Sequence, residues 1–367
     1  MTWCWEIDTW PEYEFDEAQL RPLESKFLTS AGILIGSGAH LDDSEKLEFT
    51  AALLTEEAYK TSEIEGELLN RESLQSSIRR QFNLSSDNTK VPPAEAGISE
   101  MMVDVYRAAP SPLTEETLSR WHSKVMNGRT DIDEIGTYRS GPEPMQIVSG
   151  NLVSSRIHFE APPANTVPGH MKTFTQWFNN TNSDYSQMAL TRAGIAHLWF
   201  LTIHPFEDGN GRVARALSEH SLARSLGTPS LIALASTIES DRKRYYTELE
   251  KTNTTLEITS WLVWFAETIL TAQAKSHAQV LFLIEKAKLL NRVDPHINER
   301  QRKVLLRMLS EGPKGFDGGL SAENYIRIAK TSASTATRDL QELVALKALN
   351  RTGQRKGTRY FLPFSST

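Results

Sequence analysis

The sequence predicts a mainly α-helical protein with one β-hairpin and a small α+β unit at its C-terminus. Helical composition resumes after each polar break, strand-like sequence first appears in residues 136–163, and the last seventy residues follow the order helix, turn, helix, two short strands. The 367 residues, 39% hydrophobic and 23% charged, are typical of a soluble globular protein with two or three units.

The first predicted domain, residues 1–108, is helical. Its opening, residues 3–15, mixes aromatic side chains with acids and a proline, which makes a poor helix but a plausible aromatic anchor on another surface. Helical composition then continues to about Arg80. A polar break over residues 85–93 ends in two prolines, and helical sequence resumes at Ala94.

The second predicted domain, residues 109–285, combines a helical core with a hairpin. Thr114, followed by acidic residues, marks a helix start. Residues 145–159 predict an antiparallel hairpin with a Gly/Asn turn at 149–151. The segment 188–201 is apolar on most sides, which predicts a buried helix.

The third predicted domain, residues 286–367, has the order of elements of a winged helix. The whole chain carries a net charge of −6, but residues 299–367 carry +7 and the preceding residues −13. With Arg338 on the second helix and a basic turn at 354–357, DNA is a predicted partner of residues 299–367. The alternative is a module that serves only in dimerisation or target docking.

Composition excludes several classes of protein. The single cysteine, Cys4, rules out an internal disulfide framework and a four-cysteine zinc site, and it fits a reducing compartment. No apolar run approaches the roughly 18 residues of a membrane helix, and the N-terminus lacks the basic and apolar regions of a signal peptide. We therefore expect a cytoplasmic protein without a membrane partner.

Residues 204–215, HPFEDGNGRVAR, carry the features of a phosphate site. Pro205 stops the preceding helix, and the Gly-Asn-Gly run lets the backbone turn tightly into a new helix. Free N–H groups at a helix N-terminus bind anions such as phosphates. Arg212 and Arg215 are three residues apart, so both guanidinium groups can face the same phosphates.

Two further side chains complete this predicted site. Asp208 could hold a divalent cation that bridges the phosphates, and His204 can act as a general base because histidine titrates near neutral pH. Together the residues predict nucleotidyl or phosphoryl transfer. Each feature alone is typical of an ordinary loop or solvated helix face, but seven specified residues within twelve positions are not expected by chance.

The segment matches the signature H-P-F-x-[D/E]-G-N-G-R-x-x-R at every specified position, so the chain resembles the Fic family. The resemblance implies a Fic-type helical core and transfer of AMP from ATP to a Ser, Thr or Tyr hydroxyl of a target protein. It implies that His204 is the base, that Asp208 binds Mg²⁺ and that Phe206 plugs the loop into the core. Relatives that act as kinases have lysine at the position of Gly211, so the glycine favours AMP transfer.

The resemblance also assigns residues to the nucleotide and to the target. The nucleotide-binding residues are Gly209, Asn210, Gly211, Arg212, Arg215, Tyr245 and Tyr246. The first four cradle the α- and β-phosphates, Arg215 meets the γ-phosphate, and the tyrosines close the pocket unless they merely pack in the core. Gln146, Ile147 and Val148 lie on the family's flap, a hairpin that docks a target segment by strand pairing; an ordinary surface hairpin is the alternative.

A second segment matches the inhibitory motif [S/T]-x-x-x-E-[G/N] of Fic proteins. Its assigned residues are Thr61, Glu65 and Gly66. Thr61 and Glu65 are four residues apart and share one helix face. A buried Glu65 would form a bidentate pair with Arg215 and withhold that arginine from the γ-phosphate. The alternative is a solvated acidic face made of Glu63, Glu65 and Glu67.

The leading hypothesis is a protein adenylyltransferase that uses ATP and Mg²⁺ and is inhibited in cis by Glu65. Its expected partners are a target protein with a modifiable hydroxyl and a second copy of itself, through self-modification or a homodimer. Glu65 could also position a water that removes AMP. A transcriptional or toxin–antitoxin-like regulator would use the loop only as a nucleotide sensor, which needs no base. A metal-dependent phosphohydrolase built on His197, His204 and Asp208 lacks a carboxylate-rich ligand set.

Overall fold

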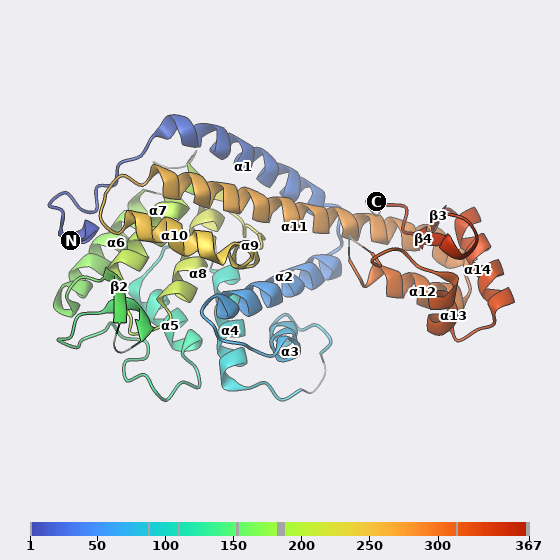
Figure 1. The fold of residues 1–367 in the computed structure, drawn as a ribbon, viewed down its shortest axis with the longest axis horizontal. Coiled ribbons are helices and arrows are strands. Elements are labelled where there is room, and N and C mark those ends of the chain that lie inside the picture. The colour runs from blue at the N-terminus through green and yellow to red at the C-terminus, as the bar shows by residue number, and fades with distance from the viewer. Residues whose placement is uncertain are drawn as a thin grey trace. The chain divides into compact units, whose positions relative to one another are not determined.

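The computed structural model describes residues 2–86, 89–108, 111–151, 154–181, 188–312 and 315–364 (Figure 1). It is mainly helical, as predicted. The chain divides into two compact units, Met1–Ile33 with Lys46–Lys275, and Leu34–Glu45 with Ser276–Thr367. The predicted boundaries of three domains at 108/109 and 285/286 stay a prediction. No helix in the described ranges is long and apolar enough to cross a membrane.

The first unit is built from the helices up to the first half of α11. They are α1 (Glu17–Gly38), α2 (Asp43–Ile64), α3 (Arg71–Gln81), α4 (Pro93–Arg107), α5 (Glu115–Val125), α6 (Val167–Asn180), α7 (Ala189–Ile203), α8 (Asn210–Leu226), α9 (Leu234–Ser240), α10 (Arg242–Thr252) and α11 (Thr259–Val293). Thr114 caps α5, as predicted, by accepting the N–H of Thr117 at 3.2 Å. The polar breaks before α4 and α5 fall where proline and small polar residues predict them.

The N-terminal aromatic segment lies against the rest of the first unit, as predicted. Trp5 Nε1 donates to the carbonyl of Glu160 at 2.7 Å, and the Trp3 ring meets Phe159 edge-on with centroids 5.5 Å apart. Trp10 packs edge-on against Trp199 of α7. These long-range contacts hold a segment that forms only a short 3₁₀ turn by itself.

Helix α7 runs through the core of the first unit, and nearly all of its residues are buried. The side chain of its N-cap residue, Met188, makes no capping hydrogen bond with the described residues. Instead Glu24, a buried residue of α1, accepts the N–H groups of Leu190 (3.1 Å) and Thr191 (2.8 Å). A carboxylate thus satisfies groups that a buried helix end would otherwise leave unpaired.

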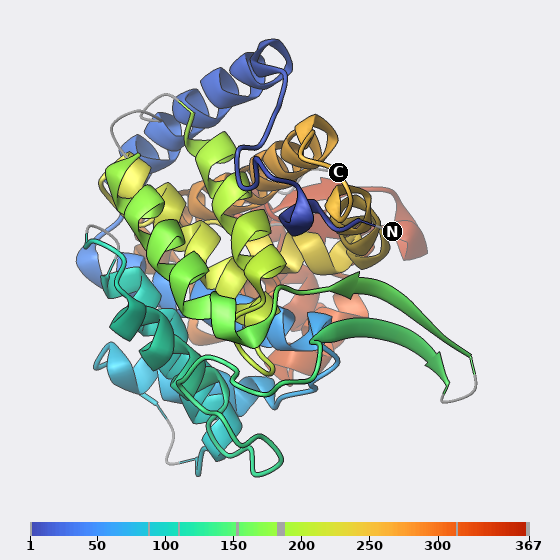
Figure 2. The ribbon, with the colours of Figure 1, turned by 90° about the vertical axis from the view of Figure 1, so that its left-hand side faces the viewer.

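The predicted hairpin is present as β1 (Gln146–Asn151) and β2 (Ser154–Glu160), paired antiparallel. Figure 2 shows both strands extending away from the helices of the first unit. The predicted turn at 149–151 is wrong, because Gly150 pairs with Ser155 and Asn151 with Ser154, so these residues belong to the strands. Residues 152–153 lie outside the described residues.

The second unit contains the second half of α11 and the C-terminal elements α12 (Glu299–Leu309), α13 (Ala322–Ala329), α14 (Ala333–Ala345), β3 (Asn350–Thr352) and β4 (Arg359–Phe361). Its core includes Leu305, Tyr325 and Leu340. Buried Asp339 of α14 accepts hydrogen bonds from Arg300 of α12 (3.1 Å) and from the hydroxyl of Tyr325 (3.0 Å). The C-terminal helices come before an antiparallel hairpin, which is the predicted order of elements. The winged-helix assignment stays a prediction.

Candidate active site

The candidate site forms where α7 ends and α8 begins. His204 closes α7 in the left-handed region, with φ +49°. Buried Arg139 secures this turn, because its Nε donates to the carbonyl of His204 at 2.7 Å and its backbone N–H to the carbonyl of Pro205 at 2.9 Å. Sequence reasoning placed Arg139 near the hairpin and missed this contact, which joins positions 65 residues apart.

Phe206 anchors the loop in the core, as the resemblance implies. Its ring is fully buried and stacks on His122 of α5, with centroids 4.0 Å apart. The side chain of Asn210 closes the loop, accepting the N–H of Phe206 at 3.0 Å and donating to its carbonyl at 2.8 Å. This side chain is therefore engaged within the loop, and Asn210 can meet a phosphate only through its backbone N–H.

His122, which sequence reasoning also missed, fixes the middle of the loop. Its Nδ1 accepts the N–H of Gly136 at 2.9 Å, so its Nε2 carries the proton and donates to the carbonyl of Asp208 at 3.1 Å. Burial lowers the pKa of His122 to about 4, so the ring stays neutral. A neutral ring with one fixed tautomer gives the loop a rigid support.

The Asp208 carboxylate lies at the loop's outer side. Its Oδ1 accepts the N–H of Gly209, and its Oδ2 pairs with Arg129 at 2.9 Å, while Arg129 also binds Asp131. Burial alone would raise the pKa of Asp208, but the Gly209 N–H and the charges of Arg212 and Arg129 hold it below its ordinary value. Asp208 is therefore an ionised oxygen donor at neutral pH.

His204 is held as a neutral base. Burial, and then the positive charge of Arg139, lowers the pKa of His204 to about 4. Its Nδ1 is buried and, among the described residues, has no hydrogen-bond partner. An unprotonated imidazole is what a general base requires.

Gly209 is favoured by its backbone conformation, and a Cβ at either glycine of the loop would meet the end of a neighbouring side chain. Gly209, at the N-cap of α8, has φ +78°, and a Cβ there would lie 2.7 Å from Met126 Cε. A Cβ at Gly211 would overlap the carboxylate of Glu65. Because Gly211 has no side chain, a neighbouring group can approach the backbone in the first turn of α8. In this structure that group is the carboxylate of Glu65.

Both arginines of the first turn of α8 are paired with the segment at the end of α2. Arg215 donates to Thr61 Oγ1 (2.6 Å), to the Thr61 carbonyl (2.9 Å) and to Glu65 Oε1 (2.7 Å). The predicted bidentate pair is not formed, because only Nη2 of Arg215 bonds to Glu65, and Nη1 has no hydrogen-bond partner among the described residues. Arg212 hydrogen-bonds to Glu67, a pairing that sequence reasoning missed. The predicted burial of Glu65 is wrong, since the side chains of Glu65 and Glu67 are 29% and 28% exposed, but both carboxylates pair with buried arginines.

A cleft of about 680 Å³ joins this loop to the hairpin. His204, Gly211 and Glu65 line one part of it, and Ile147 and Val148 of β1 line another. Both β1 side chains are about half exposed. Gln146, the other predicted docking residue, instead bonds to Glu160 on the paired strand, at 2.7 Å.

Both predicted pocket tyrosines line the cleft, but they differ in burial and in their partners. Tyr245 is buried, and its hydroxyl hydrogen-bonds to Nε2 of His197 at 2.9 Å, while Nδ1 of His197 bonds to Ser218. His197 is therefore a satisfied core histidine rather than a metal ligand. Tyr246 is 42% exposed, lines the cleft and hydrogen-bonds weakly to the carbonyl of Ile64 at the end of α2.

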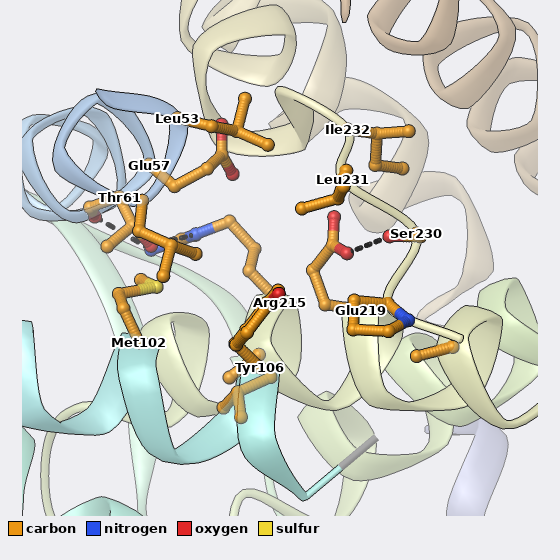
Figure 3. A pocket seen from close by; sticks show the side chains of 15 residues that line it. Leu53, Glu57, Thr61, Met102, Tyr106, Arg215, Glu219, Ser230, Leu231 and Ile232 are labelled. Atoms are coloured by element: carbon orange, nitrogen blue, oxygen red, sulfur yellow. Dashed lines mark hydrogen bonds between the residues drawn. The ribbon is translucent and has the colours of Figure 1, made fainter. Parts of the chain in front are cut away.

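A small cavity of about 50 Å³ lies behind Arg215, between α2, α4 and α8 (Figure 3). Figure 3 shows Arg215 reaching toward Thr61 and the carboxyl of Glu219 bonded to Ser230. Burial raises the pKa of Glu57 to about 7; burial and then the charge of Glu57 raise that of Glu219 to about 8. Two carboxyls that hold protons near neutral pH thus face the rear of the site.

The described residues contain no group of three or more His, Cys, Asp or Glu side chains that could hold a metal ion by themselves. Mg²⁺ commonly binds through one or two carboxylates, several waters and the phosphates of its substrate. The ionised Asp208 beside the phosphate cradle fits that ligand set.

The sequence over residues 112–222 matches the Fic/DOC family, and residues 3–84 match a domain of unknown function, DUF4172. Solved structures show the same fold. A Fic family protein from Desulfovibrio desulfuricans aligns over 96% of this chain and 98% of its own, with a TM-score of 0.55 and 21% identity. A Fic domain containing signaling protein from Bacteroides thetaiotaomicron aligns over 73% and 97%, with a TM-score of 0.53 and 19% identity.

Residues 112–222 of the chain therefore form a Fic/DOC domain, and the chain has the fold of Fic family proteins. Curated relatives match in part. Protein adenylyltransferase fic-1 of Caenorhabditis elegans is 37% identical over 83 residues, 23% of this chain and 15% of that protein. Protein adenylyltransferase Fic of Drosophila willistoni is 31% identical over 144 residues, 38% and 25%. The matches to these two relatives span a quarter or less of their length.

Proposed function

We propose that this chain is a protein adenylyltransferase that transfers AMP from ATP to a Ser, Thr or Tyr hydroxyl of a target protein. One observation carries the proposal: a neutral His204 lines the same cleft as Gly211 in the first turn of α8 and the half-exposed edge of β1. The adenylyltransferase names of the partial relatives support the same activity.

In this mechanism the nucleotide's phosphates bind at the N-terminus of α8. The backbone N–H groups of Gly209, Asn210 and Gly211 would receive the α- and β-phosphates, together with Arg212, and Arg215 would receive the γ-phosphate. Tyr246 would border the nucleotide. Asp208 would hold Mg²⁺, which when bound neutralises phosphate charge.

The chemical step would use His204 as base. A target segment pairing with β1 beside Ile147 and Val148 would place its hydroxyl above the imidazole. His204 takes the hydroxyl proton while the oxygen attacks the α-phosphorus, and the bond to the β,γ-pyrophosphate breaks. Pyrophosphate leaves, and the target carries AMP. The same step on a hydroxyl of a second copy would be self-modification within a homodimer.

Inhibition in cis by Glu65 is part of the proposal. The carboxylate holds Arg215 at 2.7 Å and lies where a Cβ of Gly211 would be, in the space that a phosphate needs. Removing it frees the arginine and the space together. A water positioned by Glu65 could also reverse the modification, so the enzyme would be bifunctional.

Incubation of the full chain with Mg-ATP, Mg-GTP or Mg-UTP and a host lysate, followed by mass spectrometry of peptides, tests the function. We expect AMP adducts that increase at least about tenfold in Glu65→Gly, the effect of removing one charge-assisted contact. Glu65→Gly/His204→Ala should give none. Equal adducts in wild type and Glu65→Gly would refute the inhibition, and no adducts in any variant would refute the transfer.

The C-terminal unit supports a second proposal, contact with DNA through residues 299–367. Arg338 on α14 and Arg355 in the turn before β4 are exposed, whereas Asp339 is buried, so α14 presents the cation Arg338 to solvent. A mobility shift that weakens as salt rises is the expected result. Salt-independent binding, or none, would contradict it and leave the regulator hypothesis without support.

A further inference from the structure

We propose that Glu67 is a second inhibitory residue, which occupies Arg212 of the phosphate cradle while Glu65 occupies Arg215. The two carboxylates would then close the first turn of α8 at two points and oppose different parts of a nucleotide. The inference deepens the proposed function and relies on its assignment of the cradle to phosphates.

The end of α2 explains why two acidic residues reach the same helix. Gly66 lies in the left-handed region, with φ +83°. Its N–H bonds to the carbonyl of Glu63 at 3.0 Å, and the N–H of Glu67 bonds back to the carbonyl of Ser62 at 3.0 Å. These two bonds form a Schellman motif, which reverses the chain after the helix. Gly66 thus brings Glu67 back beside Glu65, at no steric cost.

The partners on α8 match this spacing. Arg212 and Arg215 are three residues apart on one face, and each side chain is only 3% exposed. Glu67 and Glu65, by contrast, are 28% and 29% exposed. The arginines are therefore fixed parts of the core, whereas the carboxylates lie at its solvent side and can be displaced by another anion.

The two pairs should act on different nucleotides. Arg212 is the cradle residue for the α- and β-phosphates, which ADP and ATP share, and Arg215 is the residue for the γ-phosphate, which only ATP has. Glu67 should therefore weaken the binding of both nucleotides. Glu65 should affect ATP more strongly than ADP, because it holds Arg215 in addition to lying over Gly211. A nucleotide without a γ-phosphate separates the two contacts.

Calorimetric titration of the full chain with Mg-ADP tests the inference. We expect Glu67→Gln to bind ADP about tenfold more tightly than wild type, because a charged hydrogen bond to Arg212 is replaced by a neutral one. Glu63→Gln is the matched control, since Glu63 lies on the same helix end but pairs with Lys60 at 2.6 Å. It should bind ADP as wild type does, and the thermal unfolding midpoint of each variant checks folding.

Several outcomes would overturn the inference. Equal ADP affinity of folded wild type and Glu67→Gln would do so, as would an equal gain in Glu63→Gln, or no ADP binding by Glu65→Gly/Glu67→Gln. The proposed transfer is tested separately, because ADP binding requires no chemistry. If Glu67→Gln binds ADP more tightly but no AMP adducts form, the inhibitory role of Glu67 is supported and the transferase is refuted. If adducts form but ADP affinity is unchanged, the transferase is supported and the inhibitory role of Glu67 is refuted.

Discussion

Four glutamates from the N-terminal part of the chain contact later helices of the first unit, but they do so in two different ways. Glu24 and Glu57 are buried and accept backbone N–H groups at the starts of α7 and α9. Glu65 and Glu67 are more than a quarter exposed and pair with arginine side chains on α8. The same functional group therefore makes structural caps in one region and exchangeable contacts in the other.

The difference follows from solvent access. When a buried cap is removed, water cannot reach the N–H groups, so their desolvation is not offset. At a partly exposed arginine pair, water or a phosphate can take the place of the carboxylate. The burial of a glutamate, and whether its partner is a helix start or an arginine side chain, decide whether it stabilises the fold or can act on the site as proposed.

The largest effect is expected from Glu24→Ala. It should lower the free energy of unfolding by about 3 kcal/mol, since it removes a helix cap and leaves buried donors unpaired. Urea denaturation followed by tryptophan fluorescence measures this, because all eight tryptophans lie in the first unit. Glu65→Gly, the matched exposed position, should change stability by less than about 1 kcal/mol. Equal losses would remove the distinction between caps and exchangeable contacts.

A smaller effect is expected from the buried carboxyl that faces the cap residue Glu57. Because the pKa of Glu219 is about 8 when folded and 4.5 when unfolded, the folded state binds more protons between these values. Its contribution to stability is complete below pH 4.5 and is lost as pH rises through 8. Relative to wild type, Glu219→Gln should gain about 1 kcal/mol per pH unit from pH 5 to 7. A constant difference would place Glu219 in solvent.

The smallest effect is expected for the acid side of the catalytic pH profile. Since the pKa of His204 is lowered to about 4, the base stays neutral well below pH 6.5. In Glu65→Gly, protonation of His204 should therefore not lower kcat/KM for AMP transfer between pH 7.5 and about 5.5. Loss of a carboxylate that favours the imidazolium lowers the pKa further. A decline centred near pH 6.5 would show a solvated, ordinary histidine.

Much of the site could be predicted because its chemistry is local. The left-handed Gly209, the helix start at Asn210 and the i, i+3 placement of Arg212 and Arg215 all lie within one turn-and-helix segment. Thr61, Glu65 and Gly66 form a similar local segment at a helix end. The contacts that hold these segments were not visible, since Arg139, His122 and Arg129 reach the loop from positions far away in the chain.

By itself the sequence determined the helical class, the hairpin, the segment proposed to bind phosphates and the helix end proposed to inhibit it, because periodicity, glycine and proline positions and short spacings act over one or two turns. Only the tertiary structure decided which partner each charged side chain meets. It placed Glu67 on Arg212, buried Tyr245 against His197 and gave Glu57 and Glu24 to helix starts. The reason is physical: pairing and burial depend on which segments pack together in space, and side chains alike in sequence acquire different energies from different surroundings.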